Sequence, residues 1–272
     1  MSKTSCPNCG YIRFWRIRRN KNKCKKCRYE YSPKVYPVKG IRSTANEWRV
    51  CVKFFLLIRT IKGVTRETGL GQSRVEKMIK VLREVMLEDV PGRFSGTTEI
   101  DETYIGGQRK NKKLHIRKLS PPKRGHGTDK IPILGLFNRK SGQVYLKIID
   151  RKKKGRGTKI HRIFDVIKEK TYEGSVIYSD SYELYINLSK YHNCEHHSIN
   201  HHQGEYSRGD VHTNNIEGFW GILKRKLGCV GGVQRKNYKY FIAEIVWKFN
   251  HRKLSINEQV EILMNKTKRF GG

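Results

Sequence analysis

The chain has 272 residues, with 58 Lys and Arg against 24 Asp and Glu, which gives a formal net charge of +34. Its apolar fraction of 36% supports a folded core and excludes a wholly disordered chain. A charge of this size favours nucleic acid as the first expected partner and an anionic membrane surface as the second, while the absence of a long apolar run argues against a transmembrane helix.

The first predicted element is a small basic module over residues 1–40. Residues 1–50 hold 14 basic and 2 acidic side chains, a net of +12. Two Cys-x-x-Cys pairs supply four thiolates for one structural Zn²⁺, with no position left for water. No secretory signal is visible, so we expect a reducing compartment and treat four free thiols, rather than disulfides, as the alternative. The ligands are Cys6, Cys9, Cys24 and Cys27.

The segment between the two cysteine pairs interleaves aromatic and basic side chains. This composition suits phosphate contact and base stacking. In a second interpretation the aromatic rings pack on the cysteine turns and only the arginines face water, and both can hold together. The candidate DNA contacts are Arg13, Arg16, Arg18 and Arg19.

Residues 44–90 have a helical pattern, with a helix over 47–60, a short helix near 64–68 and a longer one over 73–87. Gly69 and Gly71 mark the turn before the longer helix. These proportions are typical of a helix-turn-helix, whose second helix enters the major groove. A helical hairpin that only packs is the alternative. The candidate DNA contacts are Gln72, Ser73, Arg74 and Lys77.

The third region covers residues 95–255 and is followed by a tail over 256–272. Strand patterns occur at 97–105, 131–138, 143–149 and 175–179, and helical patterns at 158–170, 182–191, 213–227 and 238–253. This order predicts a mixed sheet flanked by helices. The whole chain is therefore expected to be an α+β multidomain protein.

Acidic residues are scarce in this region, so their positions are informative. Asp101 lies in the middle of a strand, Asp180 ends a strand, and Glu217 begins a helix. Carboxylates at such places could converge and bind two Mg²⁺ or Mn²⁺ ions, and Lys224, seven residues after Glu217, would meet a phosphate. The spacing leaves an alternative open, in which Asp180 caps a helix and Glu217 forms a surface ion pair.

Two further segments each allow two interpretations. The basic segment 106–130 either grips DNA phosphates or is a solvated loop. The His-rich segment 191–202 resembles a metal cluster, but a strand whose histidines pair with neighbouring side chains explains it as well. The candidate DNA contacts in the basic segment are Arg109, Lys110, Lys112 and Lys113.

The motifs EIDETYIGG, GRGT, IYSDSYELY and VHTNNIEGFWGILKR occur in an order that resembles the DDE transposases of the Merlin superfamily and their bacterial insertion-sequence relatives. The resemblance covers residues 97–252, and the zinc ribbon and helix-turn-helix ahead of it also match the usual layout. It implies an RNase H-like catalytic domain with two divalent metal ions. It also implies transposition at terminal inverted repeats, with a homo-oligomer on the synapsed DNA ends.

By this resemblance Asp101 matches the first catalytic carboxylate, Asp180 the second and Glu217 the third, and Lys224 matches the basic residue that follows. Some family members carry Asn at the third position, so Asn215 stays an alternative. The expected function is therefore a DNA transposase working on terminal repeats and target DNA, in a bacterial cytoplasm at the nucleoid or in a eukaryotic nucleus. A non-catalytic DNA-binding protein is the main alternative, and a stand-alone nuclease is another.

Overall fold

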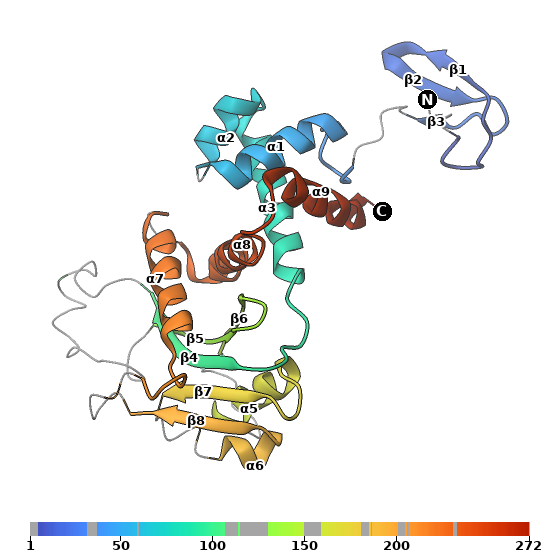
Figure 1. Ribbon diagram of the computed structural model, residues 1–272. Helices are drawn as coiled ribbons and strands as arrows, with labels where there is room; N and C mark the ends of the chain where they lie inside the picture. Colours follow the sequence, from blue (N-terminus) through green and yellow to red (C-terminus); the bar gives the residue numbers. More distant parts are fainter. Residues whose placement is uncertain are drawn as a thin grey trace. The chain divides into compact units, whose positions relative to one another are not determined.

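The computed structural model divides into two compact units, Met1–Val85 with Ser255–Gly272, and Met86–Leu254. None of its described helices has both the length and the apolar composition needed to cross a membrane. Figure 1 shows the elements of each unit in sequence colours. The structure describes residues 5–31, 37–58, 60–106, 114, 130–149, 159–180, 185, 187–200, 205, 207–230 and 233–271.

The amino-terminal segment folds as a small antiparallel sheet in the order β1-β2-β3. Its strands are β1 (Phe14–Ile17), β2 (Lys21–Cys24) and β3 (Glu30–Tyr31), with the short 3-10 turn η1 (Arg18–Asn20) between the first two. The buried cluster of this sheet consists of Cys6, Cys24 and Tyr31. So small a core gives this sheet little apolar stabilisation of its own.

Three helices follow, α1 (Ala45–Leu57), α2 (Ile61–Thr68) and α3 (Gln72–Glu88). Thr44 and Glu47 form a capping box at the start of α1. Gly69 ends α2 in the left-handed conformation with φ 66°, which a residue without a Cβ adopts at little cost. The turn expected at this glycine is therefore present between α2 and α3.

The residues expected as a tail instead form a helix, α9 (Ile256–Thr267), followed by the 3-10 turn η7 (Lys268–Gly271). A capping box of Ser255 and Glu258 starts α9, and its apolar side chains include the buried Leu263 and Met264. The helix packs against α1, where Arg49 donates hydrogen bonds to Glu261. The amphipathic stripe of α9 is the physical reason why this segment folds back into the first unit.

The second unit contains a five-stranded sheet in the order β6-β5-β4-β7-β8. Strands β4, β5 and β6 are antiparallel, whereas β7 runs parallel to β4 and β8 parallel to β7. This is the mixed sheet that the sequence predicts. Its edge strand β8 lies in the His-rich segment. The strands are β4 (Thr98–Ile105), β5 (Ile131–Asn138), β6 (Gln143–Ile148), β7 (Val176–Asp180) and β8 (Glu195–Ile199).

Helices cover both faces of this sheet (Figure 1). Helices α5 (Lys159–Lys170) and α6 (Leu188–His192) pack on the face that includes Ile100. Helices α7 (Asn214–Gly228) and α8 (Tyr238–Asn250), joined by the 3-10 turn η6 (Arg235–Asn237), pack on the other face. Because side chains alternate along a strand, the neighbours of Ile100 in β4, Glu99 and Asp101, face α7.

Candidate functional site

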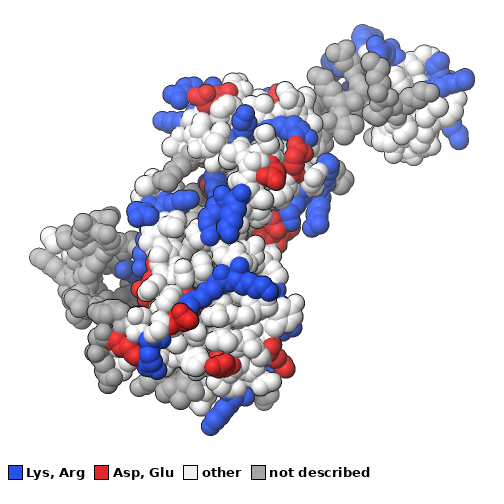
Figure 2. Space-filling view, viewed as in Figure 1, with Lys and Arg blue, Asp and Glu red and all other residues white. Residues whose placement is uncertain are grey.

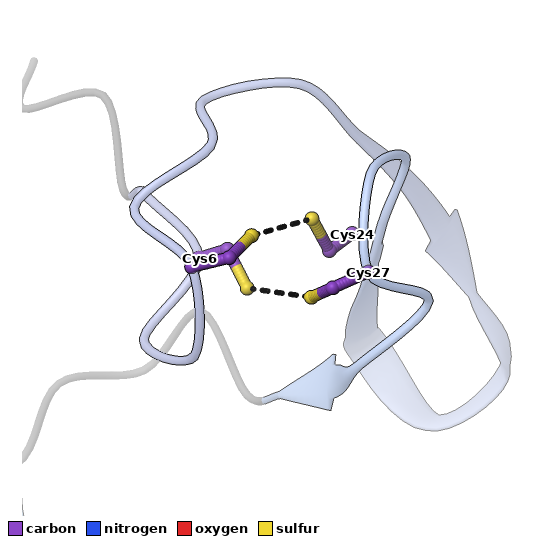
Figure 3. A group of neighbouring side chains, drawn as sticks. Cys6, Cys24 and Cys27 are labelled. Atoms are coloured by element: carbon purple, nitrogen blue, oxygen red, sulfur yellow. Dashed lines mark hydrogen bonds between the residues drawn. The ribbon is translucent and has the colours of Figure 1, made fainter.

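The four cysteines of the amino-terminal sheet gather their sulfur atoms at one point. All four Sγ atoms lie within 4.8 Å of one another, with 3.5 Å between Cys6 and Cys27 and 3.6 Å between Cys9 and Cys24. Figure 3 shows Cys6, Cys24 and Cys27 pointing toward one another from two turns of the chain. Within the described parts of the chain, no other group of His, Cys, Asp and Glu brings its ligand atoms so close together.

This sulfur cluster fits a zinc ion. A tetrahedral site with Zn–S bonds of about 2.3 Å separates its sulfurs by roughly 3.8 Å, close to the spacing observed. The four side chains can therefore hold a structural zinc.

The three acidic residues singled out in the sequence lie on the sheet face covered by α7. The register of β4 and β7 pairs Glu99 with Tyr178, and Asp101 and Asp180 are each two residues further along their strands. Glu217 is in the first turn of α7. After burial, the negative charges of Asp180 and Glu217 are among the causes that raise the pKa of Asp101.

Burial is the largest cause of the raised pKa of Asp101, which is about 7, and the two neighbouring carboxylates add to it. Hydrogen bonds from Trp220 and from the Glu102 backbone lower it in part. Among the described residues, the three carboxylates do not form a group whose ligand atoms lie as close together as the four sulfurs do.

Two N–H groups hold the carboxylate of Asp101. The indole Nε1 of Trp220 donates to Oδ2 at 2.8 Å, and the backbone N–H of Glu102 donates to Oδ1 at 2.7 Å. One donor comes from α7 and the other from β4 itself. The helix that carries Glu217 is thus bonded directly to the strand that carries Asp101.

A second bond set fixes the start of α7 to β4 through Glu99, whose side chain is fully buried. Its Oε2 accepts from the backbone N–H groups of Asn215 at 2.9 Å and Ile216 at 3.1 Å. Its Oε1 accepts from the Asn215 amide and from Arg139 Nε, both at 2.7 Å. A carboxylate at this position satisfies the free N–H groups of the helix and meets the positive end of its dipole.

Arg139 extends this anchor to the neighbouring segments. It donates to the backbone oxygens of Asp210 at 2.8 Å and His212 at 3.0 Å, just before α7. Its guanidinium lies 4.7 Å from the centre of the Tyr178 ring on β7. Arg139 therefore connects β5, β7 and the approach to α7. Among the residues of this anchor, the sequence analysis singled out only Asn215, as the alternative to Glu217 at the third catalytic position.

The two candidates for the third carboxylate position differ in their contacts. Both residues are exposed, but the Asn215 side chain donates to Glu99, whereas the Glu217 side chain accepts from Thr213 Oγ1 at 2.7 Å. Lys224 is exposed on α7, two turns further along nearly the same face.

The candidate DNA contacts of the first unit are exposed. Arg13, Arg16, Arg18 and Arg19 are all exposed, and the exposed ring of Trp15 has Lys25 at 5.5 Å and Arg28 at 5.0 Å. On α3, Ser73 and Lys77 are exposed, Gln72 donates to Glu76 at 2.8 Å, and Arg74 lies 3.7 Å from Glu47.

In Figure 2 the Lys and Arg side chains are scattered over the visible face. Arg109, Lys110, Lys112 and Lys113 lie outside the described residues.

The described histidines around β8 bind neighbouring side chains. His196 shares a hydrogen bond with Ser179 Oγ at 2.8 Å, and His197 shares one with Glu195 at 2.7 Å. His192 on α6 lies 2.7 Å from Thr171 Oγ1. The pairing interpretation of the His-rich segment accounts for these three side chains.

Comparison with known proteins places these residues in one family domain. The model of the ISXO2-like transposase domain matches residues 93–250. An uncharacterized protein in transposable element ISH50 of Halobacterium salinarum is 26% identical over 244 residues, which are 85% of this chain and 80% of that protein. The matched domain contains all three carboxylates, Lys224 and the anchor at the start of α7.

Two solved structures of Mos1 transposase are also similar. A paired-end complex with the left transposon end is 10% identical, with a TM-score of 0.27 and coverage of 85% of this chain and 80% of that one. A pre-cleavage transpososome is 9% identical, with a TM-score of 0.25 and coverage of 83% and 79%. Scores this low do not establish a shared fold.

Proposed function

Because the chain belongs to the family of ISXO2-like transposases, we propose that it is the DDE-type DNA transposase of an insertion sequence. In this proposal it binds the terminal inverted repeats of its element, cleaves a strand there and transfers the strand to target DNA. The observation that carries the proposal is the placement of Asp101 on β4, Asp180 at the end of β7 and Glu217 in the first turn of α7, all inside the matched domain. The strand order, an antiparallel β6-β5-β4 followed by parallel β7 and β8, supports an RNase H-like domain.

Asp101, Asp180 and Glu217 are the proposed ligands of two Mg²⁺ or Mn²⁺ ions. When bound, such ions activate the attacking water or 3′-hydroxyl and stabilise the leaving oxygen of phosphoryl transfer. The chain itself orients the ligands, since Trp220 and the Glu102 backbone hold Asp101, and Thr213 holds Glu217. The proposed role of Lys224 is to contact the phosphate that the metal ions polarise.

The amino-terminal parts supply the proposed affinity for DNA ends. One zinc ion at the four cysteines holds the ribbon that carries Arg13, Arg16, Arg18 and Arg19. Helices α2 and α3 act as a helix-turn-helix, with Gln72, Ser73, Arg74 and Lys77 at the start of the helix that reads the groove. We propose that copies of the chain assemble as a homo-oligomer when two DNA ends are paired, at the nucleoid of a prokaryotic host.

The direct test incubates the purified full-length protein with Mg²⁺ and DNA that carries the ends of its own element. Strand cleavage at the ends and joining to a second duplex are the expected products, separated on a sequencing gel. Tight binding of the ends without cleavage, at any divalent cation concentration, would favour the non-catalytic DNA-binding protein. Cleavage without preference for the ends would favour the stand-alone nuclease.

A further inference from the structure

Trp220 is buried on α7 and makes one polar contact with the candidate site, the 2.8 Å bond from its indole nitrogen to Asp101. We propose that Trp220 is a positioning residue, which holds the Asp101 carboxylate in the orientation that binds a divalent cation. The inference rests on the proposed function, because it deepens the role assigned there to Asp101.

The two bonds to Asp101 leave room for a cation. A carboxylate has about four lone-pair sites, two on each oxygen. Trp220 occupies one site on Oδ2 and the backbone of Glu102 occupies one on Oδ1, so a further site on each oxygen is left. Since the two donors come from different elements, they fix the plane of the carboxylate and not only its position. Without the indole N–H, the carboxylate can rotate about its bond to the chain.

The sheet is shaped to admit this indole ring. Gly135 of β5 lies directly opposite Asp101 in the register of the two strands. A Cβ at Gly135 would lie 2.4 Å from Cη2 and 2.5 Å from Cζ2 of Trp220, far inside van der Waals contact. A glycine in a central strand usually marks such a close approach. The place of the ring over β5 therefore depends on the missing side chain.

The same unit contains a matched bond elsewhere. The indole nitrogen of Trp247 on α8 donates to Asp89 Oδ2 at 2.8 Å, and Trp247 is also buried. Asp89 is not among the three carboxylates of the candidate site. Loss of an indole N–H can thus be compared at two places that differ in their proposed role but not in chemistry.

The experiment measures Mn²⁺ binding to the full-length protein without DNA, by electron paramagnetic resonance of the free ion. Trp220→Phe keeps an aromatic ring and removes the donor, and we expect it to weaken Mn²⁺ binding about 10-fold or more, as is usual for partners of metal ligands. Trp247→Phe is expected to bind Mn²⁺ like the wild type. Thermal unfolding of both variants checks that a loss of stability does not explain their difference.

Gly135→Ala tests the same idea from the other strand, because the added methyl group would lie within 2.5 Å of the Trp220 ring and 2.8 Å from Ile216 Cδ1, and so displaces both side chains without changing the indole itself. We expect it to weaken Mn²⁺ binding in the same direction. Gly221→Ala is its control, since an added Cβ there meets nothing within 4 Å. If Trp220→Phe and Gly135→Ala both bind Mn²⁺ as their controls do, Trp220 only packs and the inference is wrong.

Asp101→Ala separates this failure from a failure of the proposed function. If Asp101→Ala weakens Mn²⁺ binding but Trp220→Phe does not, the carboxylate site stands and only the role of Trp220 is lost. If Asp101→Ala binds Mn²⁺ like the wild type, Asp101 is no cation ligand. That result would overturn the proposed catalytic site and the inference together.

Discussion

Replacing Glu99 by glutamine should loosen the start of α7, the helix that carries Glu217. The wild-type carboxylate accepts four hydrogen bonds, two on each oxygen. A glutamine amide keeps one oxygen and turns an NH₂ group toward the other two donors. In either orientation of the glutamine amide, two of the four N–H groups that bonded to the carboxylate face the NH₂ group instead of an oxygen. They lose their acceptor at a position where the residue-99 side chain is fully buried.

The size of the effect follows from the hydrogen bonds that the substitution breaks. Removing one partner of a buried ion pair costs roughly 3–5 kcal/mol of unfolding free energy. The side chain of Arg139 is 22% exposed, so water can replace part of the hydrogen bonding that Arg139 loses. We therefore expect a cost at the lower end of this range, about 3 kcal/mol. At about 2–4 °C per kcal/mol for a domain of roughly 150–250 residues, the melting temperature should fall by about 6–12 °C.

Calorimetry measures this shift, and hydrogen exchange of the first turns of α7 shows where the structure has loosened. Glu169→Gln is the matched control, because this glutamate on α5 is 62% exposed and its change should stay within about 0.5 kcal/mol. An unchanged melting temperature for Glu99→Gln, with unchanged exchange in α7, would refute the anchoring role of Glu99.

Three further predictions concern zinc, salt and pH. A strong chelator should remove one zinc per chain and unfold β1–β3, seen as loss of exchange protection there; a metal-free preparation with these strands intact would argue against a structural zinc. Replacing the four ribbon arginines by glutamine should reduce the slope of log affinity for DNA against log salt by about 0.9 for each phosphate that is no longer neutralised, and an equal slope would remove them from the interface. Burial lowers the pKa of His192 below its usual 6.5; the positive charges of Lys168 and Arg93 lower it further, and the negative charge of Glu173 raises it in part. The folded state therefore binds this proton less readily than the unfolded state does. This contribution to stability should be complete above pH 6.5 and decrease as the pH falls below it; His192→Gln should flatten the acid side of the stability curve, and a curve parallel to that of the wild type would contradict the prediction.

Local patterns predicted most of the sheet. Apolar runs and alternation mark β4, β5, β6 and β7 to within a residue or two of their observed ends. The positions of Asp101 in one strand and Asp180 at the end of another therefore followed from the sequence. The cysteine cluster followed as well, because a Cys-x-x-Cys turn is a local feature.

The contacts that orient the site were not predictable in the same way. Glu99 binds residues 116 and 117 positions later in the chain, and Trp220 bonds to Asp101 across 119 positions. A glutamate in a strand has no local feature that distinguishes a buried helix anchor from a solvated side chain. The role of Gly135 likewise depends on a ring from a distant helix.

One strand and one helix were predicted less completely than the rest. A strand was only one of two interpretations of the His-rich segment, because β8 carries Glu195, His196 and His197 and an edge strand this polar shows no apolar run. Helix α9 did have a readable start, with Ser255 and Glu258 at capping-box spacing ahead of apolar residues. Its place beside α1 depends on long-range packing that no local pattern encodes.

We propose that Asp101, Asp180 and Glu217 form one catalytic centre. The most direct measurement compares strand cleavage and joining, in Mg²⁺ and on the element's own ends, for alanine variants of the three carboxylates and for Asn215→Ala. We expect the three acid variants to lose both reactions while still binding the ends. Asn215→Ala should keep measurable activity, because its backbone N–H still bonds to Glu99. Activity in Glu217→Ala together with its loss in Asn215→Ala would contradict the third assignment, and activity in all three acid variants would contradict the centre itself.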